Sequence, residues 1–298
     1  MPPDGAGSER PGAAILPRGV TNVKIGCHLS ISKGFKAAAE AALQLGGQSF
    51  QFFTKNPRAF RGRGPQDGPE GVALCREHGL VAVAHAPYVT NLSTPDPELH
   101  EITVQSLVQD LRIAESCGAI GLVVHCGKHL EKGEEYGVAR MVETLDRILA
   151  EYEGPVPILL ENTAGQGSEL GTDLEELLRI RDRVAQKDRI RFCFDTCHAF
   201  VAGQYDPEDW ERYAQRMRET GYRDLLVAVH LNDAKAPRGS RRDRHENLGK
   251  GYIGEAGLTA ILQSDIFAGL PVVLETPVNA QEEYGPEMAY ARKLAGIA

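Results

Sequence analysis

Histidines and carboxylates recur in this 298-residue sequence directly after short apolar runs, and both kinds of side chain bind metal ions. Six candidate ligands finish apolar runs, and three more follow in the loops behind two of these runs. A lone buried histidine is usually only hydrogen-bonded, but nine such groups are costly to bury together unless cations compensate them. The candidate ligands are His85, His125, Glu161, Asp195, His198, His230, Asp243, His245 and Glu275.

The mixture of imidazole and carboxylate ligands favours zinc, with manganese or iron as alternatives, because magnesium and calcium prefer all-oxygen sites. Nine ligands are too many for one tetrahedral ion and fit two or three ions that share carboxylates. Four carboxylates make the metal-free pocket strongly negative, and three divalent ions would make it positive. The sequence therefore predicts a multinuclear metal site that attracts a phosphate.

Eight short apolar runs must position these ligands, and their length is typical of buried parallel strands. They are Ile25–His28, Ser49–Phe53, Val81–His85, Leu122–His125, Ile158–Glu161, Phe192–Asp195, Leu226–His230 and Val272–Glu275. Apolar residues at helical spacing lie between the runs. Thr172 and Glu175 predict a capping box at one helix start, and Asp206 before Pro207 predicts another start.

Eight strands, each followed by a helix, predict a (β/α)8 TIM barrel, in which every strand ends at the same rim. An open doubly wound sheet is the alternative, but it would need a glycine-rich turn after the first strand, where Cys27–Ser30 stands. We expect the active site at the C-terminal rim of the barrel strands. We expect one barrel domain over residues 21–298, preceded by a flexible tail over residues 1–20.

The composition is that of a globular protein, with 42% hydrophobic and 25% charged residues and a net charge of −8. No apolar stretch is long enough for a membrane span, and the first 20 residues lack the apolar core of a secretory signal. The six cysteines are expected to be reduced thiols. These features predict a cytoplasmic protein that is not secreted and has no membrane partner.

Two basic segments stand out from this acidic background. Residues 51–66 contain four basic residues and no acidic one, and residues 235–250 contain six basic residues against two acidic ones. Local cationic loops on an acidic body suit an anionic ligand at one site better than a diffuse coat of nucleic acid. Solvated loop charge is the alternative explanation for either segment.

Six motifs in this order resemble the endonuclease IV family of zinc-dependent apurinic/apyrimidinic endonucleases. The resemblance extends from about residue 23 to the C-terminus and rests on Phe53–Arg58, His85–Tyr88, Glu161–Gly167, Asp195–His198, His230–Lys235 and Asp243–His245. It implies a TIM barrel with three zinc ions that cuts the DNA backbone 5′ to an abasic site. The products would be a 3′-hydroxyl and a 5′-deoxyribose phosphate, and blocked 3′ ends would also be cleared.

The resemblance also assigns the ligands to three ions. His85, His125 and Glu161 would hold the first; Glu161, Asp195, His230 and Glu275 the second, with Glu161 bridging; and His198, Asp243 and His245 the third. Manganese or iron could replace part of the zinc. The chain has Cys126 where the family usually has proline.

The mechanism implied is attack on phosphorus by a metal-activated hydroxide, because zinc lowers the pKa of bound water to about 7. Glu161 would be the catalytic residue that orients the water. Double-stranded DNA with an abasic site would be the partner of a monomeric enzyme. Arg58, Tyr88 and Val89 resemble side chains that enter the duplex at the lesion, and Arg238, Arg241 and Arg242 would contact phosphates.

Two other functions remain open at this point. A sugar isomerase or epimerase with one or two metals needs only Glu161, Asp195, His230 and Glu275, and leaves the other candidate ligands and the basic loops without a role. A zinc-dependent protein that binds lesions without cutting them is the second alternative. Metal count and incision of abasic DNA distinguish the three.

Overall fold

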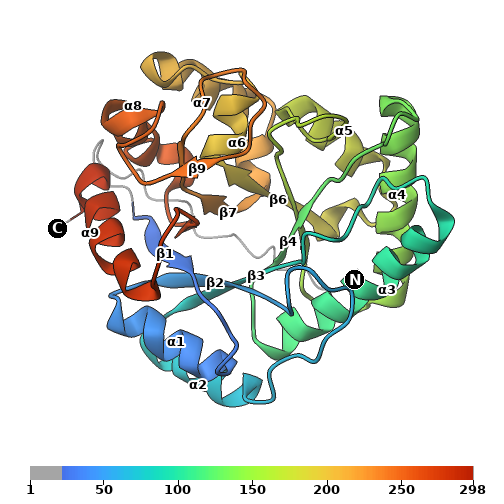
Figure 1. The fold of residues 1–298 in the computed structure, drawn as a ribbon, viewed down its shortest axis with the longest axis horizontal. Helices are drawn as coiled ribbons and strands as arrows, with labels where there is room; N and C mark the ends of the chain where they lie inside the picture. Colours follow the sequence, from blue (N-terminus) through green and yellow to red (C-terminus); the bar gives the residue numbers. More distant parts are fainter. Residues whose placement is uncertain (1–21, 298) are drawn as a thin grey trace, which may run out of the picture.

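A closed barrel of eight parallel strands forms the centre of the computed structural model, which describes residues 22–297 (Figure 1). Around the barrel the strands follow the order β1-β10-β7-β6-β5-β4-β3-β2. The first and last strands pair, with Lys24 opposite Pro271, and this pairing closes the barrel. The predicted TIM barrel is therefore confirmed. The tail expected over residues 1–20 lies outside the described residues.

The barrel strands match the eight apolar runs closely. They are β1 Lys24–His28, β2 Ser49–Phe53, β3 Val81–His85, β4 Leu122–His125, β5 Ile158–Glu161, β6 Ile190–Asp195, β7 Leu226–His230 and β10 Pro271–Leu274. Two short strands, β8 Asp233–Ala234 and β9 His245–Glu246, form a separate antiparallel pair after β7. Val83, Val123 and Leu159 belong to a small cluster of buried side chains from five neighbouring barrel strands, and the larger core contains side chains from both strands and helices.

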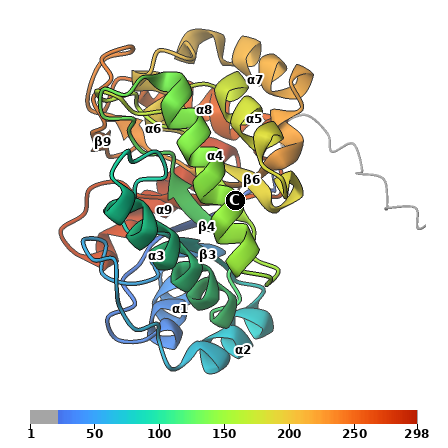
Figure 2. The same cartoon turned by 90° about the vertical axis from the view of Figure 1, so that its right-hand side faces the viewer.

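Helices surround the barrel, as the views along and across it show (Figures 1 and 2). They are α1 Phe35–Gln44, α2 Gly68–His78, α3 Pro97–Ser116, α4 Glu134–Glu151, α5 Leu174–Arg183, α6 Thr196–Val201, α7 Trp210–Glu219, α8 Gly254–Leu262 and α9 Tyr284–Ala295. The helices described between residues 22 and 297 are each too short or too polar to cross a membrane. All six cysteines are buried and free.

The start of α5 differs from the predicted capping box by one residue. The Asp173 carboxylate accepts the hydrogen bond of the Glu176 backbone N–H, and the Glu176 carboxylate accepts that of Thr172. Thr172 and Glu175 therefore do not cap the helix. The prediction for Asp206 is confirmed, because its carboxylate accepts a hydrogen bond from the Glu208 backbone and opens the turn that leads into α7.

Strand register places two pairs of candidate ligands side by side at the rim. His125 at the end of β4 is paired with Glu161 at the end of β5, and Asp195 at the end of β6 is paired with His230 at the end of β7. Parallel strands of a barrel all end at the same face, so residues in matched register become neighbours there.

An ion pair between Lys55 and Asp110 is buried behind the end of β2. Their side chains are 1% and 0% exposed, and Lys55 Nζ lies 3.0 Å from Asp110 Oδ1. Lys55 also donates to the Ser106 carbonyl at 3.1 Å, and the Thr54 hydroxyl donates to the same Asp110 oxygen. These bonds join the loop after β2 to α3.

We predict that replacing Asp110 by alanine lowers the free energy of unfolding by about 3–5 kcal/mol, because Lys55 is left as an unpaired buried charge. Chemical denaturation measures this change. The double variant Lys55→Met/Asp110→Leu, which removes both charges, should recover most of the loss. An Asp110→Ala variant as stable as the parent would contradict the prediction.

Candidate metal centre

The structure brings all nine candidate ligands to the C-terminal end of the barrel. Five of them are the last residues of barrel strands, and Glu275 directly follows β10. His198 lies in α6, which begins at the residue after β6. Asp243 lies in the loop before β9, and His245 is the first residue of β9. The elements that supply ligands thus come from all three thirds of the chain, between residues 81 and 275.

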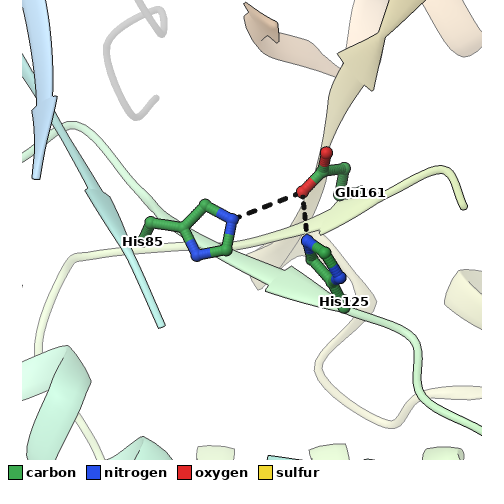
Figure 3. Close-up of side chains that lie close together, drawn as sticks. All are labelled: His85, His125 and Glu161. Atoms are coloured by element: carbon green, nitrogen blue, oxygen red, sulfur yellow. Dashed lines mark ion pairs between the residues drawn. The ribbon is translucent and has the colours of Figure 1, made fainter. Parts of the chain in front are cut away.

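Glu161 is the centre of this arrangement and is 1% exposed. Its Oε2 lies 3.0 Å from His125 Nε2 and 3.5 Å from His85 Nε2 (Figure 3). Its other oxygen, Oε1, lies 3.0 Å from His230 Nδ1 and 3.3 Å from His198 Nδ1. One buried carboxylate therefore contacts four imidazoles, and each of its oxygens faces two of them.

The remaining candidates extend this cluster on the side of β6 and β7. His230 Nδ1 also lies 3.3 Å from Glu275 Oε2. Asp243 Oδ1 lies 3.2 Å from His198 Nε2 and 3.5 Å from His245 Nε2. His245 Nε2 is in turn 3.7 Å from an Asp195 carboxylate oxygen.

Two of the three expected ligand sets occur as groups whose ligand atoms lie within 4.8 Å of one another. They are His85 with His125 and Glu161, and Glu161 with Asp195, His230 and Glu275. The third expected set, His198, Asp243 and His245, is joined pairwise through Asp243. Within the same distance, His245 groups with Asp195 and His198, and separately with Asp243 and Cys197.

Mutual contact controls the charges in the cluster. Burial alone would raise the pKa of Glu161, but the imidazoles of His230 and His125 outweigh burial and hold that pKa well below its usual range. Burial alone would lower the pKa of His198, but Asp195 and Asp243 outweigh it and raise that pKa well above its usual range. The imidazoles would have to give up protons for metal to bind.

Two buried atoms in the cluster have no hydrogen-bond partner among the described residues, namely Glu161 Oε2 and His245 Nε2. Buried polar atoms normally have a partner, and one without it needs an explanation such as an ion. Both atoms belong to ligand types that zinc accepts, and both lie within groups of the right size for a cation. The residues present therefore fit a bound metal.

Residues beside the ligands hold them in place, and sequence analysis did not find these. Gln51 on β2 donates to Glu275 Oε1 at 2.7 Å and is hydrogen-bonded to His230 Nε2 at 2.8 Å. Asn232 donates to Asp195 Oδ2 at 2.7 Å and accepts the hydrogen bond of the Glu275 backbone N–H. Such outer contacts orient metal ligands, and the signal in the sequence is an asparagine close behind a strand-end ligand.

The chain matches the model of a family described as xylose isomerase-like TIM barrels over residues 39–294. It is 64% identical over 274 residues to a protein named probable endonuclease 4 of Symbiobacterium thermophilum, a match that covers 91% of this chain and 99% of the relative. The chain belongs to the endonuclease IV family. A crystal structure of endonuclease IV from Thermus thermophilus matches it with a TM-score of 0.78 and 32% identity, covering 91% of this chain and 99% of that one.

The barrel itself is shared more widely than the endonuclease IV family. A D-psicose 3-epimerase from Clostridium cellulolyticum H10 matches with a TM-score of 0.62 and 15% identity, over 92% of this chain and 96% of that one. This likeness shows the fold alone. The sugar isomerase or epimerase alternative is therefore not favoured beside the endonuclease IV relative at 64% identity.

The predicted lesion contacts of this endonuclease IV chain lie beside the first ligand set. Tyr88 is 57% exposed, and its ring centroid lies 5.6 Å from that of His85 and 5.7 Å from that of His125. Its backbone N–H donates to the Pro57 carbonyl at 3.0 Å, which places the loop with Arg58 next to it. Arg58 is exposed and Val89 is half-buried.

The predicted phosphate contacts lie in the loop between β8 and β9, which also carries Asp243. Arg238 donates through Nε to the Tyr205 carbonyl at 2.6 Å and through Nη2 to the Gly203 carbonyl at 2.9 Å. The Arg241 backbone N–H donates to the Val201 carbonyl at the end of α6. Two donors of Arg238 thus fix the loop, whereas the exposed Arg242 side chain has no such bond among the described residues.

We predict that Arg238→Ala frees this loop, because two charge-assisted hydrogen bonds worth about 1.5–3 kcal/mol each are lost. Bound metal per chain should fall and protease cleavage within residues 235–244 should accelerate. Elemental analysis and limited proteolysis measure both effects. Arg242→Ala is the matched control and should retain the metal content of the parent; equal behaviour of the two variants would contradict the role of Arg238.

Proposed function

We propose that this chain hydrolyses the DNA backbone on the 5′ side of abasic sites and leaves a 3′-hydroxyl and a 5′-deoxyribose phosphate. As a member of the endonuclease IV family, the chain is an apurinic/apyrimidinic endonuclease. The observation that carries the proposal is the convergence of nine imidazole and carboxylate side chains, with Glu161 at their centre. We extend the proposal to the clearing of blocked 3′ ends, since the same bond type is cut there.

The proposed cofactors are three zinc ions, with manganese or iron as partial replacements. His85, His125 and Glu161 would hold one ion, and Glu161, Asp195, His230 and Glu275 a second. His198, Asp243 and His245 would hold the third, and the pairwise contacts through Asp243 support this set. Bound zinc supplies Lewis acidity toward phosphate oxygens and a hydroxide nucleophile at neutral pH.

The protein's own residues supply position and charge. Glu161 is the proposed catalytic residue, because its buried carboxylate is shared by two of the ligand sets and would orient the attacking water beside them. Gln51 and Asn232 fix the carboxylates of Glu275 and Asp195, so these ligands do not reorganise during the reaction. No lysine need form a covalent adduct with the sugar, so the proposed reaction is hydrolysis and not β-elimination.

The proposed partner is double-stranded DNA with an abasic site, bound by one copy of the chain in the cytoplasm, where it has access to the nucleoid. A duplex lacking a base kinks and flips at low cost, and specificity can come from that deformability. Tyr88 and Val89 would fill the space of the missing base, and Arg58 would enter beside them. Arg241 and Arg242 would contact phosphates, as would the Nη donors of Arg238 that the loop leaves unused.

We predict that the zinc-loaded protein cuts a duplex with one tetrahydrofuran residue and that the chelator-treated protein does not. This residue cannot undergo β-elimination, so a cut means hydrolysis. Glu161→Gln should lower the rate by about 10²–10³-fold or more, because it removes a charge shared by two ligand sets. Gel analysis of the cleaved strand measures the rate.

Glu77→Gln is the matched control, since Glu77 is an exposed carboxylate near the end of α2, and its rate should equal that of the parent. Covalent trapping of DNA by borohydride would show a Schiff base and would overturn the hydrolytic mechanism.

We predict that Tyr88→Ala weakens binding to tetrahydrofuran DNA by about 1–3 kcal/mol and leaves binding to undamaged DNA almost unchanged, because stacking at the lesion is lost. Fluorescence anisotropy measures both affinities. Tyr136→Ala is the control, because Tyr136 is an exposed tyrosine on α4. Loss of zinc from the Tyr88 variant with intact affinity for the lesion would contradict this role.

A further inference from the structure

The basic segment 51–66 contains charges that the metal centre and the lesion contacts do not use. Lys55 is buried and neutralised by Asp110, so it presents no charge to a ligand. Arg58 stands next to Tyr88, and Arg61 and Arg63 follow it in the same loop, both exposed. The outward charge of the segment is therefore carried by arginines, and two of them have no assigned role.

A cavity of about 760 Å³ opens between this loop and α3. Phe60, Arg61 and Arg63 line it from the loop, and Ile102 and Arg112 line it from α3. Arg112 is exposed and adds a third guanidinium group to the same cavity. None of the nine candidate metal ligands lines the cavity, so it is separate from the metal centre.

The three arginines in the cavity wall have no partner for their charge within residues 22–297. Among the described residues, the side chains of Arg61, Arg63 and Arg112 form neither an ion pair nor a hydrogen bond. The acidic side chain in the cavity wall, Glu101, is already paired with Arg147 at 2.6 Å. The cavity therefore presents three guanidinium groups without a compensating carboxylate, which is the chemistry of an anion site.

The walls of the cavity are held together before any ligand arrives. Gln109 on α3 donates to the Gly62 carbonyl at 2.8 Å, and Lys55 donates to the Ser106 carbonyl at 3.1 Å. A Cβ on Gly62 would lie 2.8 Å from that of Lys55, so glycine allows the loop to run this close to its own buried lysine. The loop therefore holds Arg61 and Arg63 over α3 in a preformed arrangement.

We propose that this cavity binds backbone phosphates of the duplex arm that flanks the abasic site. The inference rests on the proposed function, which brings DNA to the rim beside Arg58. Three arginines in one cavity suit several phosphates in a row, because each guanidinium can form two parallel hydrogen bonds to phosphate oxygens. These contacts position the duplex and carry no sequence information, so they act on undamaged nucleotides next to the lesion.

The test compares the Arg61→Gln/Arg63→Gln/Arg112→Gln variant with the parent on two tetrahydrofuran duplexes, one with long arms and one with arms of a few base pairs. With the long-arm duplex, the slope of log affinity against log salt should be smaller in magnitude for the variant than for the parent. The difference should be up to about 3, at about 0.9 for each phosphate contact removed. The KM should rise, and the kcat and the metal content should stay unchanged. On short arms, the variant should bind and cut like the parent.

Two further variants keep the result unambiguous. The first is a control that makes the same charge change away from the cavity, near the amino-terminal ends of β3, β6 and β7, and it carries Arg76→Gln/Arg191→Gln/Arg223→Gln. Its salt slope should equal that of the parent. Replacing the three cavity arginines by lysine keeps the charge and should restore most of the slope. Thermal unfolding checks that each variant is folded.

A slope equal to that of the Arg76/Arg191/Arg223 control, or an equal loss on short arms, would overturn the phosphate site. If free phosphate or polyphosphate can replace the long arm, the parent will bind the short-arm duplex as tightly as the long-arm duplex when either anion is added. That result would overturn the phosphate site as well, since the ligand would then be a free anion. Failure of the parent protein to cut either duplex would instead refute the proposed function, so the two failures are distinguishable.

Discussion

Ionisable groups buried at one end of the barrel must compensate one another, and this requirement governs the structure around them. Glu161 is 1% exposed and contacts four imidazoles, and these contacts hold its pKa down against the effect of burial. A buried carboxylate without such neighbours would move to a solvent-exposed position or take up a proton. Cations of the kind proposed would strengthen the same compensation, because they bring positive charge to carboxylates that already lie together.

The parallel barrel is what allows this concentration of charge. Strands in matched register deliver His125 beside Glu161 and Asp195 beside His230, although these residues are far apart in the chain. The side-chain amides of Gln51 and Asn232 then form further hydrogen bonds to Glu275 and Asp195. The strand ends thus determine which ligands meet, and the neutral amides between them orient the ligand carboxylates.

The fold and the meeting of the nine candidate ligands could be predicted from the sequence, because the barrel strands are short, mostly apolar runs and six candidate ligands stand at or directly after the ends of such runs. The helix α6 could not, since its six residues are all buried and show no amphipathic period. The α5 cap was misplaced by one residue because Thr172 and Asp173 are both capping types, and only the backbone geometry chooses between them. Lys55 was counted as surface charge because its partner Asp110 lies on a different element, which no local pattern reveals.

Six candidate ligands stand at strand ends, but Asp243 and His245 stand on a loop that is tied to α6 and to the short β8–β9 pair. Loops behind barrel strands tolerate insertion and replacement far better than the strands themselves. Changes in this loop can therefore alter the contacts of Asp243 and His245 while the strand register that positions the other ligands is kept.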